Sequence, residues 1–228
     1  MEHELRKHIK NIVTETVNRK KSIWKRVADI ALECLIIVFA VSFAVFMERQ
    51  REHKHEQQEA SEFLQGLKLD LENDIAEMKN DRASYVSMET SYNYFSKKEK
   101  PNLDSNKKYV QYIGDVIELL PNIGRYEGFK SSGKMNTVEN SDLRNKIHDL
   151  YEETVPGLLN STTYFNNRRR ENEKIFIEND FDINKVTQNK YFKSYASIYK
   201  WECASIVRRY SKAINEAEKI LKLIEEEL

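Results

Sequence analysis

The chain has 228 residues, of which 37 are basic and 37 acidic. Because these charges balance, there is no global attraction to nucleic acid, and we expect no nucleic-acid partner. Six glycines, three prolines and a charged fraction of 32% favour long helices over sandwiches or α/β folds. The composition therefore predicts an all-α protein.

Residues 1–23 form a basic segment in which apolar side chains recur at helical spacing. We expect this segment to lie in the cytosol. Two interpretations stay open: a short amphipathic helix on the inner leaflet, and a positive tail whose charge only sets the topology. The apolar positions are Leu5, Ile9, Ile12, Val13 and Val17.

Residues 24–47 are predicted to form a transmembrane helix. The stretch from Val27 to Met47 reads VADIALECLIIVFAVSFAVFM and includes two charges, Asp29 and Glu33. A spanning helix needs roughly 20 mainly apolar residues to cross a ~30 Å hydrocarbon core. No A-x-A cleavage site follows, and a polar, helix-favouring segment continues directly, so we expect a retained single-pass anchor. The alternative is the buried helix of a soluble protein.

The charges that flank this helix predict its orientation. Residues 7–26 carry seven Lys/Arg, whereas residues 48–67 carry three. By the positive-inside rule, the N-terminus lies in the cytoplasm and residues 48–228 lie outside. We therefore expect a protein of the bacterial inner (cytoplasmic) membrane with a periplasmic C-terminal domain. Cys34 lies in the membrane and Cys203 beyond it, so no intramolecular disulfide is expected there.

One face of the membrane helix is acidic and then small. Asp29 and Glu33 are four residues apart, and the same face continues through Ile37, Ala40 and Ala44. Small residues let helices approach closely, and a carboxylate in the membrane needs a partner or a proton. An acid at the helix centre costs about 2.5–3.5 kcal/mol on insertion scales. We expect this face to bind another helix; snorkelling of Glu33 toward water and a proton or ion role are the alternatives.

A polar stalk follows the membrane helix. Residues 48–59 contain no apolar side chain, so a helix formed by them would be solvated on every face. The apolar periodicity that begins after the stalk extends to Phe95. The helix is expected to run there from Trp24, either without interruption or with a break near Ser84 or Ser91.

Residues 60–228 are predicted to form an extracytoplasmic helical bundle. Two apolar stripes with coiled-coil spacing, within residues 60–95 and 192–224, are expected to carry bundle or subunit contacts. The stripe positions on which the prediction depends are Leu64, Leu67, Leu71, Ile75 and Met78 in the first, and Tyr199, Ile206, Tyr210 and Ile224 in the second.

Turn-forming residues divide the middle of the bundle. Lys100-Pro101-Asn102 is expected to end the long helix, and Asp104 or Ser105 to cap a helix that stops at Pro121. Residues 122–140 contain three glycines and are predicted to form a loop or short turns.

Two further helices complete the predicted bundle. Asn140 or Ser141 caps the first, and Pro156-Gly157 should kink or break it before a helical stretch to about Ile177. The last helix covers roughly residues 188–227. The predicted fold class is therefore all-α: a single N-terminal transmembrane helix that runs into a long helix, followed by an antiparallel helical bundle.

Motifs for catalysis or metal binding are weak. Residues 128–134 match G-x-x-x-x-G-K, but Met135 stands where a phosphate-binding loop needs Ser or Thr, and no apolar strand precedes it. His53 and His55 point apart on a helix and cannot share one ion. The sequence has no H-E-x-x-H, G-x-S-x-G or C-x-x-C pattern. We expect no enzyme activity, no metal and no cofactor.

Two arginine clusters occur in the second half of the chain, Arg168-Arg169-Arg170 and Arg208-Arg209. Acidic residues such as Glu202 lie close to them in the sequence. We interpret the clusters as solvated helix faces; a site for an anionic partner is the alternative.

Two blocks of the sequence carry a family resemblance. The first comprises Glu33, Glu48-Arg49 and Leu64-x-x-Leu67-Lys68-x-Asp70-Leu71-x-x-Asp74-Ile75, and the second comprises Lys130-Ser131-Ser132-Gly133, Asn140, Leu143-Arg144-x-x-Ile147 and Tyr151. Together they resemble a family of single-pass membrane proteins, mainly from Bacteroidota, that is described only as a domain of unknown function. Its members carry an acidic residue at the entry of the membrane helix and an S-G…N-x-x-L-R-x-x-I motif.

The resemblance spans about residues 25–155. The chain departs from the family in its membrane helix, which lacks the usual glycines and the Asn/Trp-rich exit, so a glycine seam for close helix packing is not expected. The resemblance implies a bacterial inner-membrane location, and it supplies no catalytic residues.

We expect a non-enzymatic, membrane-anchored protein that acts as an oligomeric scaffold or as an accessory subunit of a membrane complex. Its expected partners are the lipid bilayer and either copies of itself or another membrane protein. The first alternative is a periplasmic sensor domain for a small ligand, which a preformed pocket lined by residues 109–151 would favour. Against it, we expect no return span and no cytosolic output domain before the chain ends at Leu228. The second alternative is a subunit of an ion-driven membrane machine that uses Glu33.

Overall fold

The computed structural model describes residues 2–97, 103–114, 116–170 and 172–228, and for residues 2–5 and 7–23 it describes the backbone alone. The predicted helix end at Lys100-Pro101-Asn102 lies outside these residues, and so do the apolar side chains predicted to form the N-terminal stripe. The structure is 87% helical, and its described residues contain no strand. The prediction of an all-α fold is confirmed.

The chain divides into two compact units, Met1–His55 and Glu56–Leu228. Helix α1 (Glu2–Ser96) contributes to both units, and it has no break at Ser84 or Ser91. The Ser91 hydroxyl donates to the carbonyl oxygen one turn earlier at 2.9 Å, which satisfies this polar group inside the helix.

The first unit is helical and presents its side chains to the surroundings. Every described side chain from Trp24 to His55 is exposed. Within the described residues, one helix contains an apolar stretch long enough to cross a membrane, and none of that stretch is buried. A core helix of a soluble protein would be mostly buried, so its exposure argues against that alternative.

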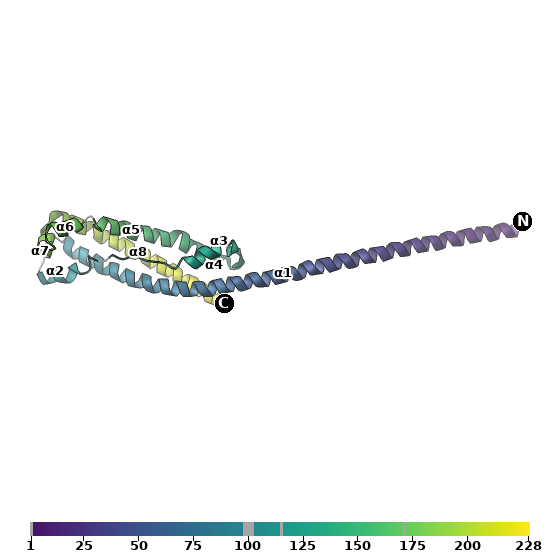
Figure 1. Ribbon diagram of the computed structural model, residues 1–228, viewed down its shortest axis with the longest axis horizontal. Coiled ribbons are helices and arrows are strands. Elements are labelled where there is room, and N and C mark those ends of the chain that lie inside the picture. The colour runs from purple at the N-terminus through teal and green to yellow at the C-terminus, as the bar shows by residue number, and fades with distance from the viewer. Residues whose placement is uncertain (1, 98–102, 115, 171) are drawn as a thin grey trace. The chain divides into compact units, whose positions relative to one another are not determined.

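The second unit is a helical bundle (Figure 1). Its long elements are the second half of α1, the run from α4 to α5, and α8. Short helices lie at the two ends of these long elements. The bounds are α2 Leu103–Val110, α3 Gly124–Ser131, the 3-10 helix η1 Lys134–Thr137, α4 Ser141–Asp149, the π-helical turn η2 Leu150–Thr154, α5 Val155–Arg170, α6 Glu173–Glu178, α7 Ile183–Gln188 and α8 Lys190–Glu227.

Helices α1 and α8 run antiparallel. Lys68 pairs with Glu225 at 2.8 Å, at the end of α8. Farther along α1, the ring centroid of Tyr92 lies 5.3 Å from that of Tyr199, near the start of α8. Residue numbers thus rise along α1 as they fall along α8, which is the arrangement that lets two apolar stripes meet along their full length.

The two stripes form the core of the bundle. Leu67, Tyr210 and Ile224 are completely buried, and the other six stripe positions named above are at most 6% exposed. Between the helices lies a chain of aromatic contacts in which Tyr85 touches both Phe165 and Tyr210, each with ring centroids 5.7 Å apart. Such pairs add about 0.5–1.5 kcal/mol each beyond the burial of their area.

The predicted helix from Asp104 to Pro121 is wrong beyond Val110. Helix α2 begins at Leu103, so neither Asp104 nor Ser105 is its cap, and residues 116–123 have no regular secondary structure. This irregular segment packs along α1 and α5, whose side chains satisfy its backbone. Asn166 Nδ2 donates to the Ile117 carbonyl oxygen at 3.0 Å, and the Leu120 amide donates to Glu77 at 3.3 Å.

Two further local predictions are corrected. The predicted loop 122–140 contains helix α3, in which Gly124 and Gly128 lie without distortion. Of the predicted kink or break at Pro156-Gly157, the break is wrong, because α5 continues through both residues. Residues Leu150–Thr154, just before α5, form a π turn, in which the Val155 amide donates to the Leu150 carbonyl oxygen. A wider turn before a proline relieves the clash of its ring with the previous turn, so the helix continues into α5.

Candidate functional site

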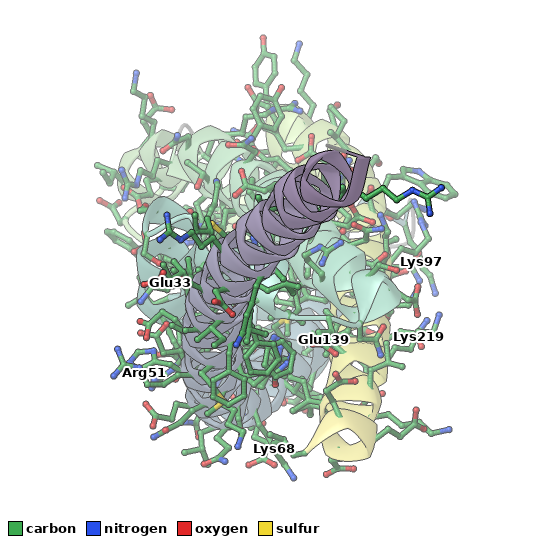
Figure 2. The ribbon with its side chains drawn as sticks, turned by 90° about the vertical axis from the view of Figure 1, so that its right-hand side faces the viewer. Glu33, Arg51, Lys68, Lys97, Glu139 and Lys219 are labelled. Atoms are coloured by element: carbon green, nitrogen blue, oxygen red, sulfur yellow. The ribbon has the colours of Figure 1, made fainter. Side chains whose placement is uncertain are left out.

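The acidic and small face predicted on the membrane helix is fully exposed. Asp29, Glu33, Ile37, Ala40 and Ala44 are all exposed in the first unit, and Glu33 projects from α1 (Figure 2). The other residues of the apolar segment are equally exposed, with Phe39 70% exposed. An apolar surface of this extent is stable only against lipid or another protein, so the segment needs a cover that the described chain does not supply.

The part of the first block from Leu64 to Ile75 contributes to the bundle structure. Leu64, Leu67 and Leu71 are core residues. The charged positions between them hold other segments in place: Asp70 accepts from Arg125 Nε at 2.8 Å, and Lys68 reaches the end of α8. These positions form no cluster with a shared opening, so they are structural residues.

Asp74 belongs to the same block and is 4% exposed. It accepts hydrogen bonds from the backbone amide of Asn122 at 3.1 Å and from its side-chain amide at 2.6 Å. Burial raises the pKa of Asp74 above its usual value, and the two hydrogen bonds from Asn122 oppose that rise. Asp74 therefore ties the irregular segment to α1.

The second block forms a turn and a helix cap. Ser131 ends α3, the Ser132 hydroxyl donates to the Phe129 carbonyl oxygen at 2.7 Å, and Gly133 has a left-handed φ of 74°. A left-handed residue at this point is least costly as glycine. The motif residues Ser131, Ser132 and Gly133 thus reverse the chain between α3 and η1.

Asn140, rather than Ser141, caps α4. Its Oδ1 accepts from the Leu143 amide at 3.1 Å, which satisfies one of the free amides of the first turn. Leu143 is completely buried, and the Arg144 Nη1 donates to the Val138 carbonyl oxygen at 2.8 Å. Asn140, Leu143 and Arg144 therefore fix the start of α4.

The G-x-x-x-x-G-K segment lines a shallow depression of about 320 Å³ next to α1. Its basic groups are already paired: Lys134 Nζ lies 2.6 Å from Glu59, and Arg125 binds Asp70. Helix α3 occupies the glycine-containing stretch, where a phosphate-binding loop would present free amides. The geometry does not suit a nucleotide phosphate.

A larger cavity of about 500 Å³ lies at the opposite end of the bundle, among α1, α2 and α5–α8. Its walls are mainly aromatic and aliphatic. They are lined by Tyr92, Val110, Ile113, Gly114, Phe176, Ile177, Phe181, Ile183, Phe192, Tyr195, Ala196 and Tyr199. This size and composition are typical of small-molecule sites. Only part of this lining comes from residues 109–151, the range in which a sensor pocket was anticipated.

Three polar side chains also line the cavity: Arg169, Asn172 and Glu173. Glu173 is exposed, whereas Arg169 and Asn172 are buried, at 8% and 5% exposed. Arg169 Nη1 donates to the Ile113 carbonyl oxygen at 2.9 Å. Among the described residues, Arg169 forms no ion pair and the Oδ1 of Asn172 has no hydrogen-bond partner.

The buried Arg169 corrects the interpretation of the first arginine cluster, residues 168–170, as a solvated face, whereas Arg208 and Arg209 of the second cluster are exposed as predicted. Arg168 is also partly buried and forms an ion pair with Glu202 of α8; of the three arginines, Arg170 alone is exposed. The burial of Tyr199 raises its pKa to about 12, so its hydroxyl stays neutral and donates to the Arg168 carbonyl oxygen at 2.9 Å.

Neither metal nor thiol chemistry finds support in the described residues. They contain no group of three or more His, Cys, Asp or Glu side chains placed to hold a metal ion. Cys203 is completely buried, and burial raises the pKa of its thiol, which keeps it protonated and inert. Cys34 is exposed in the apolar segment.

Sequence reasoning did not find the cavity, because its lining comes from six helices and no local pattern joins them. The one part of the cavity that the sequence indicates is the arginine cluster at residues 168–170, for which a site for an anionic partner is the alternative interpretation. Comparisons with known proteins add no further assignment: no family model, no curated protein and no solved structure matches the chain.

Proposed function

We propose that this protein is a non-enzymatic membrane-anchored scaffold or accessory subunit, which associates with copies of itself or with another membrane protein. The single observation that supports the proposal most directly is the bare membrane segment. Its acidic and small face, Asp29–Glu33–Ile37–Ala40–Ala44, is exposed throughout among the residues that the structure describes.

The chemistry of that face favours helix–helix association over contact with lipid alone. Alanines at positions 40 and 44 let a second backbone approach closely, which maximises van der Waals contact. Glu33, placed against a partner helix, gains a hydrogen bond that lipid does not offer. The bulky Phe39 and Phe43, stacked with centroids 6.2 Å apart, lie on another face and suit lipid.

We further propose that the N-terminus is cytoplasmic and that the bundle lies in the periplasm of a bacterial cell with the anchor in the inner membrane. The excess of Lys/Arg before the apolar segment supports this orientation. The resemblance to the Bacteroidota family of single-pass membrane proteins supports the location.

The test is cysteine crosslinking in native membranes. In a Cys34→Ser background, Ala40→Cys places a thiol on the proposed partner face, and Ser42→Cys places one about 180° around the helix. We expect crosslinked species with the first variant and monomer with the second. A monomer in both variants overturns the proposal.

Glu33→Gln separates this function from the ion-driven machine. An amide can still hydrogen-bond to a partner helix, so assembly should persist in the variant. If the variant still assembles but the membrane complex loses its ion-driven activity, the result would instead favour a titrating role for Glu33.

A second candidate function is a membrane-tethered sensor of a small ligand. The observation that favours it is the cavity of about 500 Å³ in the bundle, whose walls include the buried Arg169 and an Asn172 Oδ1 that has no hydrogen-bond partner among the described residues. Binding of a small molecule by the full chain, saturable and lost when the cavity walls are altered, would support this function.

A further inference from the structure

We propose that the cavity at the end of the bundle binds a small organic anion that has an aromatic or branched apolar body, one acid group and one hydrogen-bond donor. This inference rests on the second candidate function for the existence of a ligand. It goes beyond that function by assigning the chemistry of the ligand to particular side chains.

The walls select an apolar body. Phe176 and Phe192 are held edge to face with centroids 5.8 Å apart, and the rings of Tyr195 and Tyr199 stack at 6.0 Å. Because these rings already hold one another, the cavity does not need a ligand to shape it. A flat or branched apolar group can therefore enter with little ordering cost, and the volume accommodates a molecule of metabolite size.

Arg169 favours a ligand with a negative charge. Its guanidinium offers five N–H donors, of which the described structure uses one, for the Ile113 carbonyl oxygen. Among the described residues no carboxylate forms an ion pair with this buried cation, and the acidic residue of the lining, Glu173, is exposed. A buried cation without a counter-charge is costly, and an anionic ligand would supply one. Aromatic walls alone could hold a cation, but a cation beside Arg169 would be repelled.

Asn172 adds the requirement that the ligand carry a hydrogen-bond donor. It stands at the N-cap of α6, yet its side chain makes no capping hydrogen bond. Among the described residues its Oδ1 is buried without a hydrogen-bond partner, and an unsatisfied buried acceptor is unusual in a folded protein. A ligand N–H or O–H that reaches this oxygen removes the penalty.

The rim of the cavity also indicates an occupant. Ile177 and Phe181 line the opening and are 61% and 71% exposed. Phe181 and its neighbour Asp180 both have positive φ, 56° and 55°, in a turn where the Phe181 amide donates to the Phe176 carbonyl oxygen at 2.8 Å. Strain of this kind holds an apolar ring at the opening, where a bound ligand would cover it.

Three related compounds separate the contributions. Indole-3-acetate has an aromatic body, a carboxylate and an N–H donor. Indole-3-acetamide lacks the negative charge, and 1-naphthylacetate lacks the ring N–H. Each is titrated by calorimetry against the full chain in phosphatidylcholine nanodiscs, with empty nanodiscs subtracted. We expect indole-3-acetate to bind at least tenfold more tightly than the amide, and several-fold more tightly than 1-naphthylacetate.

Single substitutions test whether the three compounds bind in the cavity. Arg169→Met should abolish the preference for the acid over the amide, and Arg169→Lys, which keeps the charge, should retain part of it. Arg170→Met changes the adjacent but exposed arginine and is the matched control, with affinity unchanged. Phe181→Ala, which removes an exposed ring, should weaken all three compounds without affecting the core.

Each outcome decides one question. Equal affinity for acid and amide, or an acid preference that survives Arg169→Met in a folded variant, overturns the anion assignment and leaves the sensor function standing. If none of the three compounds binds at millimolar concentration, the inference and the sensor function both fail. Association through the membrane helix is read separately, by crosslinking at position 40.

Discussion

The Tyr210 hydroxyl on α8 donates to the Asp81 carboxylate on α1 at 3.0 Å, and it does so beside a tyrosine that has no such partner. The ring of Tyr85 lies 5.7 Å from that of Tyr210, centroid to centroid, and both rings are completely buried. In the described part of the chain the Tyr85 hydroxyl makes no hydrogen bond. Two neighbouring buried phenols thus differ in whether the hydroxyl has a hydrogen-bond partner among the described residues.

Phenylalanine substitutions should therefore have opposite effects at these two positions. Tyr210→Phe removes a hydrogen bond to a charged acceptor, so we expect the free energy of unfolding to fall by about 1.5–3 kcal/mol. Tyr85→Phe removes an unsatisfied buried hydroxyl and should be neutral or stabilising. Urea unfolding of the full chain in nanodiscs, followed by circular dichroism, measures both. Equal losses in the two variants would contradict the assigned hydrogen bonding.

Asp81 should make the stability of the bundle depend on pH in an unusual direction. Burial raises the pKa of Asp81 above its usual value of 3.8, and the hydrogen bond from Tyr210 offsets only part of that rise. The folded state then binds a proton more readily than the unfolded state, so this carboxylate's contribution to stability falls as pH rises from 3.8 through the folded pKa.

Asp81→Asn isolates this effect, because the amide oxygen can still accept from Tyr210 but cannot ionise. We expect the variant to gain stability relative to wild type as the pH rises from about 4 to neutral. Urea unfolding at a series of pH values checks the slope. Glu72→Gln, at an exposed position of the same helix, is the control, and wild-type and Asp81→Asn curves that run parallel would refute the prediction.

The predictable parts of this fold are those specified by nearby residues. Leu67 and Leu71, or Ile206 and Tyr210, recur at helical spacing, so the buried faces of α1 and α8 follow from the sequence alone. Glycine residues predicted the loops less reliably, because Gly124 and Gly128 lie inside α3 rather than in a loop.

The unpredicted parts depend on distant partners. The segment before α3 leaves the helical conformation because Asp74 and Asn166, each more than forty residues away in sequence, bind its backbone. The cavity depends on the same kind of contact, since Arg169 is drawn inward by the Ile113 carbonyl oxygen. A run of three arginines does not reveal which one turns inward.

The cap of α4 gives a direct test of a local prediction. Asn140→Ala removes the acceptor for the Leu143 amide, so we expect a loss of about 1 kcal/mol in the free energy of unfolding. Ser141→Ala is the matched control, because Ser141 lies inside the helix and leaves the cap intact. The same urea experiment measures both variants. A larger loss for Ser141→Ala would show that the cap lies one residue later.

The proposed orientation can be tested with single cysteines and a membrane-impermeant maleimide. Cys203 is completely buried, and burial raises the pKa of its thiol, so it should stay unlabelled in the folded chain. In a Cys34→Ser background, Lys219→Cys places a thiol at an exposed position of α8 (Figure 2) and Arg6→Cys places one before the membrane segment. With the N-terminus inside, intact spheroplasts should label the first variant, and the second should label only after permeabilisation. Labelling of Arg6→Cys alone in intact spheroplasts would show that the orientation is the reverse of the one proposed. Labelling of both variants before permeabilisation would contradict the proposed membrane span.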